Sequence, residues 1–379
     1  MGKILKIGID IRDLKIAKTG TKTYLEEICN TFKHLNNPKY KFIFFDTKIP
    51  VYTGENKFLK LIEHLRYQLW KQLFLPILAW YNNCNILFCT DNFVPVISLG
   101  YKTVPVLHDA FFFEDPEHFN KIWLWLYKKL ALPAAKKSLA VIVPTNYVKK
   151  RISHFTRINA NKIHVVYEGP KTFNTYLNDK QPSLLSDLKL TPQKYILHVG
   201  VMNKRKNIPA LITAFKQLLD SGGADDLKLV LTGNKVSKNH SNDYQLISQT
   251  ISKLNIKEYV VFTDYLSNPD LSIIYKNALF YVFPSLNEGF GIPILECFKH
   301  EIPVLVADNT CLPEVGGNAV LTFNPFLEND LYRKMKLLND HEIMRKDLIN
   351  KGNLRIKEFT WHNTATNLLA IFDGSYHKF

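Results

Sequence analysis

Short apolar runs alternate with amphipathic segments along most of the chain, and this alternation predicts the fold. In the first half, runs rich in Val, Ile, Leu and Phe end at polar or turn residues, and they lie at 4–10, 41–46, 85–90, 103–109, 139–145 and 163–169. Such runs are typical of strands that are covered on both faces of a parallel sheet. Between them, apolar residues recur at helical spacing, as over 20–32 and 58–69. The first half therefore predicts an α/β domain.

The alternation begins again after a polar stretch at 170–192, which we interpret as an interdomain linker. Apolar runs and candidate helices follow in turn, the runs at 195–200, 227–233, 259–265, 278–285 and 303–308, the helices at 207–220, 241–254, 291–299 and 328–372. Two successive alternations predict two doubly wound, Rossmann-like domains that face a central cleft. Ligands of such sheets bind at the carboxyl ends of the strands.

The length of 379 residues suits two domains. We place an N-terminal, acceptor-binding domain at 1–175 and a C-terminal, nucleotide-sugar-binding domain at 190–355. The last segment, 356–379, is expected to be a helix that packs back on the N-terminal domain. The N-terminus lacks the layout of a signal peptide, and no run of about 18 apolar residues predicts a membrane span. Five scattered cysteines without a CxxC pair indicate reduced thiols in the cytoplasm rather than disulfides or zinc.

Charge adds one candidate surface. The formal net charge is +15, and the block 121–162 holds ten Lys or Arg and no acidic residue, with Trp123, Trp125 and Tyr127 among them. Basic and aromatic side chains together suit an anionic lipid leaflet, so we consider a peripheral membrane surface here. The alternative is an ordinary packed helix with a solvated lysine face. Nucleic acid is not an expected partner, because no motif for binding it occurs.

Several enzyme classes lack their motif in this chain. The first strand is not followed by GxGxxG, as a nicotinamide or flavin dehydrogenase would require, and GxxxxGK[ST] is absent, which excludes a P-loop nucleotide hydrolase. Neither HExxH, GxSxG nor a histidine and cysteine cluster at metal spacing occurs. We therefore expect no metal and no cofactor.

The segment 284–296, PSLNEGFGIPILE, follows a predicted strand and opens a predicted helix. Gly289 and Gly291 have no side chain, so an anion can approach the backbone N–H groups at the helix N-terminus, those of Phe290, Gly291 and Ile292. The pattern indicates a phosphate-binding turn.

Glu288 and Glu296 flank this turn. Carboxylates repel a phosphate, so they are better placed to accept hydrogen bonds from the hydroxyls of a sugar and a ribose. The alternative is a capped helix with an incidental acidic pair.

The segment resembles the EGFGLPxLE signature of family-four retaining glycosyltransferases, which have the two-domain GT-B fold. Further stretches are similar to this family in the expected order, and they lie at 7–28, 70–76, 103–119, 198–215 and 303–325. In the last of these, PEV-x-G-x-A is followed by an apolar strand and a proline.

The resemblance implies roles for individual residues around the donor. Glu288 would bind the hydroxyls of the donor sugar, Glu296 those of the ribose, and the amides of Phe290, Gly291 and Ile292 would face the sugar and diphosphate. The diphosphate would be neutralised by Lys206 and Arg205 and approached from the N-terminal domain by Gly20. The alternative for 204–206 is a solvated helix start, although basic residues are unfavourable at a helix N-terminus.

The resemblance gives His108 a place beside the anomeric carbon, where it would position the sugar and stabilise positive charge. Its backbone carbonyl is implicated too. Asp109 would orient the imidazole ring, or it would cap the turn that follows.

The implied reaction moves a hexosyl group with retention of configuration, as in the synthesis of bacterial cell-surface polysaccharide. GDP-mannose is the favoured donor and a UDP-sugar the alternative, and the acceptor would be a glycan or a polyprenyl-diphosphate-linked sugar. Such an enzyme would work in the cytoplasm, on the inner face of the membrane if the basic block binds lipid. Three other functions remain open, namely a sugar-nucleotide epimerase, a glycogen synthase-like polymerase and a non-catalytic nucleotide-sugar-binding protein.

Overall fold

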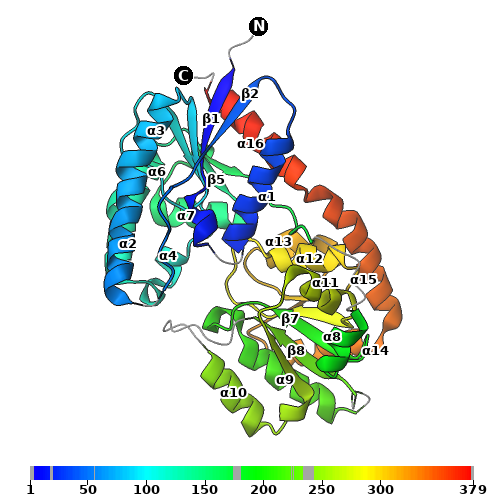
Figure 1. Cartoon of the computed structure of the whole chain (residues 1–379). Helices are drawn as coiled ribbons and strands as arrows, with labels where there is room; N and C mark the ends of the chain where they lie inside the picture. Colours follow the sequence, from blue (N-terminus) through cyan, green and yellow to red (C-terminus); the bar gives the residue numbers. More distant parts are fainter. Residues whose placement is uncertain are drawn as a thin grey trace. The chain divides into compact units, whose positions relative to one another are not determined.

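A computed structural model describes residues 4–17, 20–54, 56–173, 181–222, 224, 226–233 and 243–376. The chain divides into two compact units, both of them α/β (Figure 1). Unit 1 comprises Met1–Gly169 and Thr360–Phe379, and unit 2 comprises Pro170–Phe359. The first unit thus ends at Gly169, a few residues before the expected boundary at 175.

Unit 1 is built on a parallel sheet in the order β2-β1-β3-β4. Its strands are β1 (Leu5–Asp10), β2 (Tyr40–Phe45), β3 (Ile86–Cys89) and β4 (Lys102–Pro105). A parallel pair, β5 (Val141–Val143) and β6 (Ile163–Val165), continues it through a bridge between Val106 and Ile142. These six strands overlap the six apolar runs of the first half. Most of the strands end one to four residues before the corresponding run does.

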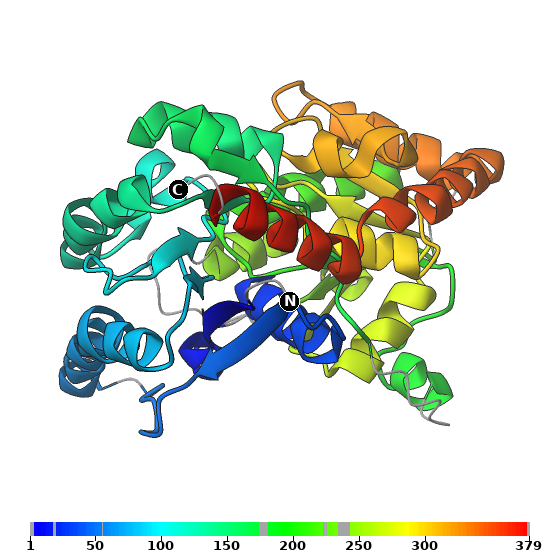
Figure 2. The same ribbon diagram turned by 90° about the horizontal axis from the view of Figure 1, so that it is seen from above.

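The helices of unit 1 cover this sheet and include the C-terminal helix of the chain. They are α1 (Gly20–His34), α2 (Lys57–Leu69), α3 (Leu75–Tyr81), α4 (Phe111–Glu114), α5 (Lys121–Leu126), α6 (Leu132–Lys137), α7 (Asn146–Thr156) and α16 (Trp361–Tyr376). In α16, Trp361, Leu368 and Phe372 share one buried core with β1 and α1, and α16 passes beside α1 when seen from above (Figure 2). Within the expected C-terminal segment, 356–358 form a 3-10 turn that belongs to unit 2.

Unit 2 has a six-stranded parallel sheet in the order β12-β11-β10-β7-β8-β9. Its strands are β7 (Tyr195–Val199), β8 (Lys228–Thr232), β9 (Val260–Asp264), β10 (Phe280–Phe283), β11 (Val304–Ala307) and β12 (Leu321–Phe323). The order reverses between β7 and β10, which is the topological switch point of a Rossmann sheet. Five strands were expected from apolar runs, and the sixth, β12, follows the PEV-x-G-x-A stretch as the family resemblance implies.

The helices of unit 2 are α8 (Gln181–Asp187), α9 (Ile208–Asp220), α10 (Tyr244–Lys253), α11 (Asn268–Lys276), α12 (Ile292–Lys299), α13 (Leu312–Gly316), α14 (Asp330–Asp340) and α15 (Glu342–Arg355). Residues 181–187, expected within a linker, instead form α8, and Leu185 is buried in unit 2. Because this stretch is mostly polar, its few apolar side chains do not predict a helix. Residues 174–180 of that linker, and 241–242 of the expected helix 241–254, lie outside the described residues.

Candidate functional site

In unit 2, two loops meet at the switch point of the sheet. Because β7 and β10 are parallel neighbours, with Tyr281 paired to Leu197, their carboxyl ends reach the same edge. The loop after β7 carries Arg205 and Lys206 in a 3-10 turn, and the loop after β10 carries Glu288. Ligands of doubly wound sheets bind at this position. The structure thus brings together residues that lie about 80 positions apart in sequence.

Glu288 is held by both cations of the facing loop. Lys206 Nζ lies 2.6 Å from Glu288 Oε1, and Arg205 Nη1 lies 3.0 Å from Glu288 Oε2. Arg205 Nη1 also donates to the carbonyl of Asn287 at 3.0 Å. Glu288 and Lys206 are buried, at 8% and 7% exposure. Lys206 is therefore not part of a solvated helix start, and that alternative is wrong for this residue.

Arg205, Lys206 and Glu288 form a triad in which the charges shift the pKa values of Glu288 and Lys206. Burial alone would raise the pKa of Glu288, but the charges of Arg205 and Lys206, with the hydrogen bond from Lys206, lower that pKa to about 2. Burial lowers the pKa of Lys206, and the carboxylate of Glu288 opposes this effect. Two positive charges thus face one negative charge, and the triad keeps a net positive charge at the edge of the sheet.

The turn before α12 has a backbone shape that depends on glycine. Gly291 has φ of 98° and is the N-cap of α12. A Cβ atom there would lie 3.1 Å from Leu312 Cδ2, so a side chain at this position would be tight as well as strained in its backbone. The thiol of Cys311 donates to the carbonyls of Glu288, at 3.2 Å, and of Phe290, at 3.3 Å. The first amides of any α-helix lack an intrahelical acceptor, and α12 aims its amides toward the switch-point edge.

Glu296 lies inside α12, and its carboxylate accepts a hydrogen bond from the hydroxyl of Tyr275 at 2.7 Å. Burial raises the pKa of Glu296, while the Tyr275 hydrogen bond opposes the rise. Tyr275, at the end of α11, stacks on His300 with ring centroids 5.2 Å apart. The aromatic partner orients the carboxylate expected to bind ribose.

His108 lies in unit 1, after β4, with both ring nitrogens near oxygen atoms. Its Nε2 is 2.8 Å from the Thr90 carbonyl, and its Nδ1 is 3.5 Å from Glu168 Oε1. Burial lowers the pKa of His108, but the hydrogen bond and charge of Glu168 outweigh it, so the pKa is raised. Both partners are acceptors, which favours the imidazolium form. Because both ring nitrogens already lie near acceptors, His108 would contact a donor sugar through its backbone carbonyl or the carbon edge of its ring.

Asp109 and Gly20 are the other two residues of unit 1 that the sequence predicts for the site. Asp109 Oδ1 accepts a hydrogen bond from the backbone N–H of Phe111 at 3.0 Å, which is the geometry of the turn cap given above as the alternative to orienting His108. Gly20 is the first residue of α1 and is exposed, and the two residues before it lie outside the described part of the chain.

Unit 1 also contains a cavity of about 460 Å³ at its own switch point, between β1 and β3. Residues that follow these strands line it, together with aromatic and charged side chains of α2 and α5, among them Arg12, Asp13, Glu63, His64, Tyr67, Thr90, Asp91 and Trp123. Thr90 is shared with His108, because its carbonyl contacts Nε2 of that ring. The cavity therefore adjoins His108 and offers hydrogen-bonding groups and ring faces to a polar ligand.

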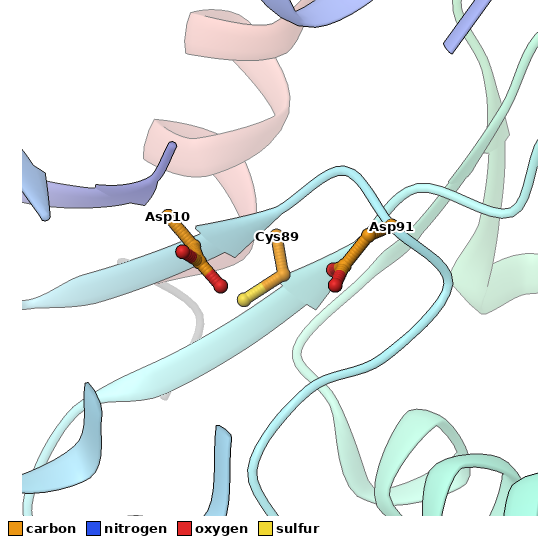
Figure 3. A group of neighbouring side chains, drawn as sticks. All are labelled: Asp10, Cys89 and Asp91. Atoms are coloured by element: carbon orange, nitrogen blue, oxygen red, sulfur yellow. The ribbon is translucent and has the colours of Figure 1, made fainter. Parts of the chain in front are cut away.

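A buried ion network lies beside this cavity. Figure 3 shows Cys89 between the carboxylates of Asp10 and Asp91, and the ligand atoms of the three residues all lie within 4.8 Å of one another. Lys71 Nζ, fully buried, is 2.5 Å from Asp10 Oδ2 and 2.6 Å from Asp91 Oδ1. The ammonium group thus supplies the cation that the two carboxylates need. We interpret the cluster as a network that fixes the strand ends.

Some of these residues were not singled out from the sequence. Five of them contact partners that are distant along the chain, so no local sequence pattern indicates their role; they are Glu168, Tyr275, Asp10, Lys71 and Asp91. For Asp10 and Lys71 the sequence offers one indication, because both lie in stretches that resemble the family, at 7–28 and 70–76.

Comparisons with known proteins agree with this geometry. Residues 184–355, which include the turn and the triad, match the family model of glycosyl transferases group 1. The match covers most of unit 2. The chain is 25% identical over 275 residues to O-antigen chain mannosyltransferase B of Escherichia coli, covering 72% of this chain and 70% of that protein. It is 28% identical over 299 residues to the O-antigen chain mannosyltransferase RfbU of Salmonella typhimurium, covering 78% and 75%.

Solved structures show the fold of the whole chain. Sucrose-phosphate synthase from Thermosynechococcus elongatus matches with a TM-score of 0.73 at 15% identity, over 99% of this chain and 100% of that one. Anabaena HepE, in complex with UDP and glucose, matches with a TM-score of 0.70 at 15% identity, over 98% and 100%. The chain has the GT-B fold, with two Rossmann-like domains, as the sequence predicted.

Proposed function

We propose that this glycosyltransferase is a retaining hexosyltransferase, which moves mannose from GDP-mannose to a glycan or lipid-linked acceptor during synthesis of bacterial cell-surface polysaccharide. The observation that carries the proposal is the buried triad of Arg205, Lys206 and Glu288 at the switch point of unit 2. It combines the two things that a nucleotide-sugar donor needs, namely net positive charge for the diphosphate and a carboxylate for sugar hydroxyls.

The diphosphate is the group that must leave, and it gains negative charge as the glycosidic bond breaks. Lys206 and Arg205, with the amides of Phe290, Gly291 and Ile292, would stabilise that charge without reorganising. Because the triad is already buried and paired, a diphosphate that enters shares these cations with Glu288 instead of desolvating them anew. This arrangement supports transfer without an obligatory metal ion or other cofactor.

In the proposed reaction, the acceptor hydroxyl attacks the anomeric carbon from the face that the diphosphate leaves. The bond from the anomeric carbon to the diphosphate oxygen breaks through an oxocarbenium-like state, the bond to the acceptor oxygen forms, and a departing phosphate oxygen takes the acceptor proton. Glu288 would fix the sugar through its hydroxyls, and Glu296, oriented by Tyr275, would bind the ribose. His108 and Gly20 are proposed to complete the donor site from unit 1. The protein acts mainly by orientation and electrostatic stabilisation.

The donor is proposed from the relatives. Both O-antigen relatives are named as mannosyltransferases, which favours mannose, whereas the HepE structure contains UDP, which keeps a UDP-sugar as the alternative. A thermal-shift panel of GDP, UDP, ADP and their sugars tests this choice, because a ligand that binds the folded state raises the unfolding midpoint. GDP and GDP-mannose should give the largest shifts, and a larger shift with a UDP-sugar would overturn the assignment of the base.

The acceptor is proposed to bind in the unit 1 cavity, which adjoins His108 and combines carboxylates with ring faces. Such a lining suits the hydroxyls and the apolar face of a sugar. Five free, buried cysteines and the proposed nucleotide-sugar donor support a cytoplasmic location for the proposed reaction.

Mass spectrometry of the products tests the reaction class. With isotope-labelled GDP-mannose and short mannosyl acceptors, we expect a single labelled hexose on the acceptor, and NMR of the purified product should show retained anomeric configuration. Isomerised donor would instead identify an epimerase, long labelled chains a polymerase, and binding without turnover a non-catalytic protein.

A further inference from the structure

The helical segment 57–81 of unit 1 has an apolar face that the described structure leaves uncovered. It comprises α2, a π-helical turn at Trp70–Phe74 and α3 without interruption, and it runs along the edge of unit 1 (Figure 1). Side chains at helical spacing point outward along it and are 45–69% exposed, namely Phe58, Leu61, Leu65, Leu69, Leu73 and Ile77. At 1.5 Å per residue the stripe is about 30 Å long, far larger than the scattered apolar residues of an ordinary surface.

The opposite face of the same segment is buried and contains two charged residues, Glu63 and Lys71. Glu63 is 8% exposed and contacts Arg12 and Arg66, while Lys71 is fully buried between two carboxylates. Surface helices of soluble proteins normally turn charged residues outward and leucines inward. Here the order is reversed, so the periodic residues at 58–69, which predict a helix correctly, do not form part of the core.

Neighbouring segments extend the apolar surface. The side chain of Gln72 accepts a hydrogen bond from the backbone N–H of Val96 at 2.9 Å, which holds the loop after β3 against the segment. Ile97, in that loop, is 61% exposed. At the end of α3, Trp80 is 59% and Tyr81 is 76% exposed. Rings of this kind are enriched where hydrocarbon meets water.

The charges around this surface are positive. Lys57 and Lys60 are exposed in the first turn of α2, whereas Glu63, the acidic residue of 57–81, is buried. Trp123 of α5 packs beside Tyr67 of α2, with ring centroids 5.5 Å apart, which brings the start of the acid-free block 121–162 next to the segment. Within that block Trp123 and Tyr127 pack inside unit 1, whereas Ile122 and Trp125 are exposed beside the lysines.

We infer that segment 57–81 is a docking surface that lies flat on an anionic lipid bilayer. Leucine, phenylalanine and tryptophan side chains would enter the boundary between headgroups and acyl chains, and the lysines would meet lipid phosphates. Among the described residues, no helix is long and apolar enough to cross a bilayer, so the contact is parallel to the membrane plane. A second copy of the chain is the other possible occupant, and the oligomeric state of the protein distinguishes it from a bilayer.

Sedimentation with vesicles tests this surface on the full chain, independently of the transfer reaction. We expect the protein to pellet with vesicles of phosphatidylcholine and 30% phosphatidylglycerol, and at least tenfold more weakly with phosphatidylcholine alone. The double substitution Leu65→Gln with Leu69→Gln should reduce binding to the anionic vesicles at least tenfold. Ile343→Gln with Leu354→Gln, at exposed apolar positions of α15 in unit 2, is the matched control and should bind like the unchanged protein.

A second measurement reports the depth of insertion without destabilising substitutions. Brominated acyl chains should quench the fluorescence of Trp80, and Trp80→Phe should remove most of that quenching. The docking surface is refuted if the unchanged protein stays in the supernatant with anionic vesicles, or if the Leu65 and Leu69 variant binds as well as the control. It is also refuted if light scattering shows a dimer that this variant dissociates while lipid binding is absent, since a second copy would then cover the face.

Discussion

The ammonium group of Lys206 lies 2.6 Å from Oε1 of Glu288, and the two side chains are buried together. Each is therefore a counter-charge of the other. Removing Glu288 leaves the charges of Arg205 and Lys206 uncompensated at the carboxyl edge of the sheet, whereas removing Lys206 leaves Glu288 paired with Arg205.

Glu288→Gln should separate the effect on stability from the effect on anion binding. The amide keeps the shape of the side chain but removes its charge, so Arg205 and Lys206 repel each other, and we expect the folded state to lose about 3 kcal/mol. The same excess positive charge should tighten the binding of GDP, while transfer falls by about two orders of magnitude because the sugar loses its carboxylate. Calorimetric titration with GDP and a product assay measure the two quantities. A purely structural role for Glu288 would weaken both together.

Gly291→Ala tests the turn before α12. The new methyl group meets Leu312 at 3.1 Å, and a residue with φ of 98° is strained by about 1–2 kcal/mol. We expect weaker binding of nucleoside diphosphates. Gly222→Ala is the matched control, because its φ is 77° and a Cβ atom there meets nothing within 4 Å. If both variants bind GDP equally well, the turn does not hold the diphosphate.

His198, in β7 and 1% exposed, should make unit 2 sensitive to acid. Burial, assisted by the charge of Lys206, lowers the pKa of His198 from 6.5 to about 4. Between pH 6.5 and 4 the unfolded chain binds a proton at this histidine that the folded chain does not bind. The contribution of neutral His198 to the free energy of unfolding is therefore fully present above pH 6.5 and is lost as the pH falls toward 4. The loss should reach about 3 kcal/mol, and His198→Gln should remove this component. Urea unfolding at pH 7.5 and 4.5 measures it. An equal acid loss in both proteins would contradict the prediction.

Trp123→Ala should weaken the acceptor site. This ring lines the unit 1 cavity, and one aromatic contact is worth about 1–1.5 kcal/mol, so the KM for the acceptor should rise about tenfold while the donor KM stays unchanged. Trp125→Ala on the same helix is the control, since that side chain is 58% exposed and does not line the cavity. A soluble acceptor keeps lipid binding out of the comparison. Equal KM values for the two variants would place the acceptor elsewhere.

Much of the fold could be predicted because every strand except β12 overlaps a short apolar run that ends at a turn signal. The exceptions have physical reasons. In α8, the buried Leu185 lies in a mostly polar stretch, and in 57–81 the apolar periodicity is real but faces outward. A hydrophobic pattern alone states which residues share a face and leaves open which face is buried.

The site could be predicted in part. Gly291 and Glu288 belong to one local turn, and the spacing of its glycines and glutamates predicts a phosphate-binding turn with hydroxyl-binding carboxylates. Lys206 could be predicted as an anion-binding residue because a cation at the start of a helix is unfavourable without an anion. The pairing of Lys206 with Glu288 could not be read from the sequence, since parallel strands β7 and β10 bring together loops that lie 82 residues apart.

The most direct test is the contribution of the β-phosphate to nucleotide binding in the presence and absence of Lys206. Calorimetric titration should show that GDP binds the unchanged protein at least about tenfold more tightly than GMP, and that Lys206→Met reduces this ratio to near one. Lys204→Met, at the exposed neighbouring cation, should keep the ratio. If Lys206→Met retains the full preference for GDP over GMP, the diphosphate is not bound by this loop.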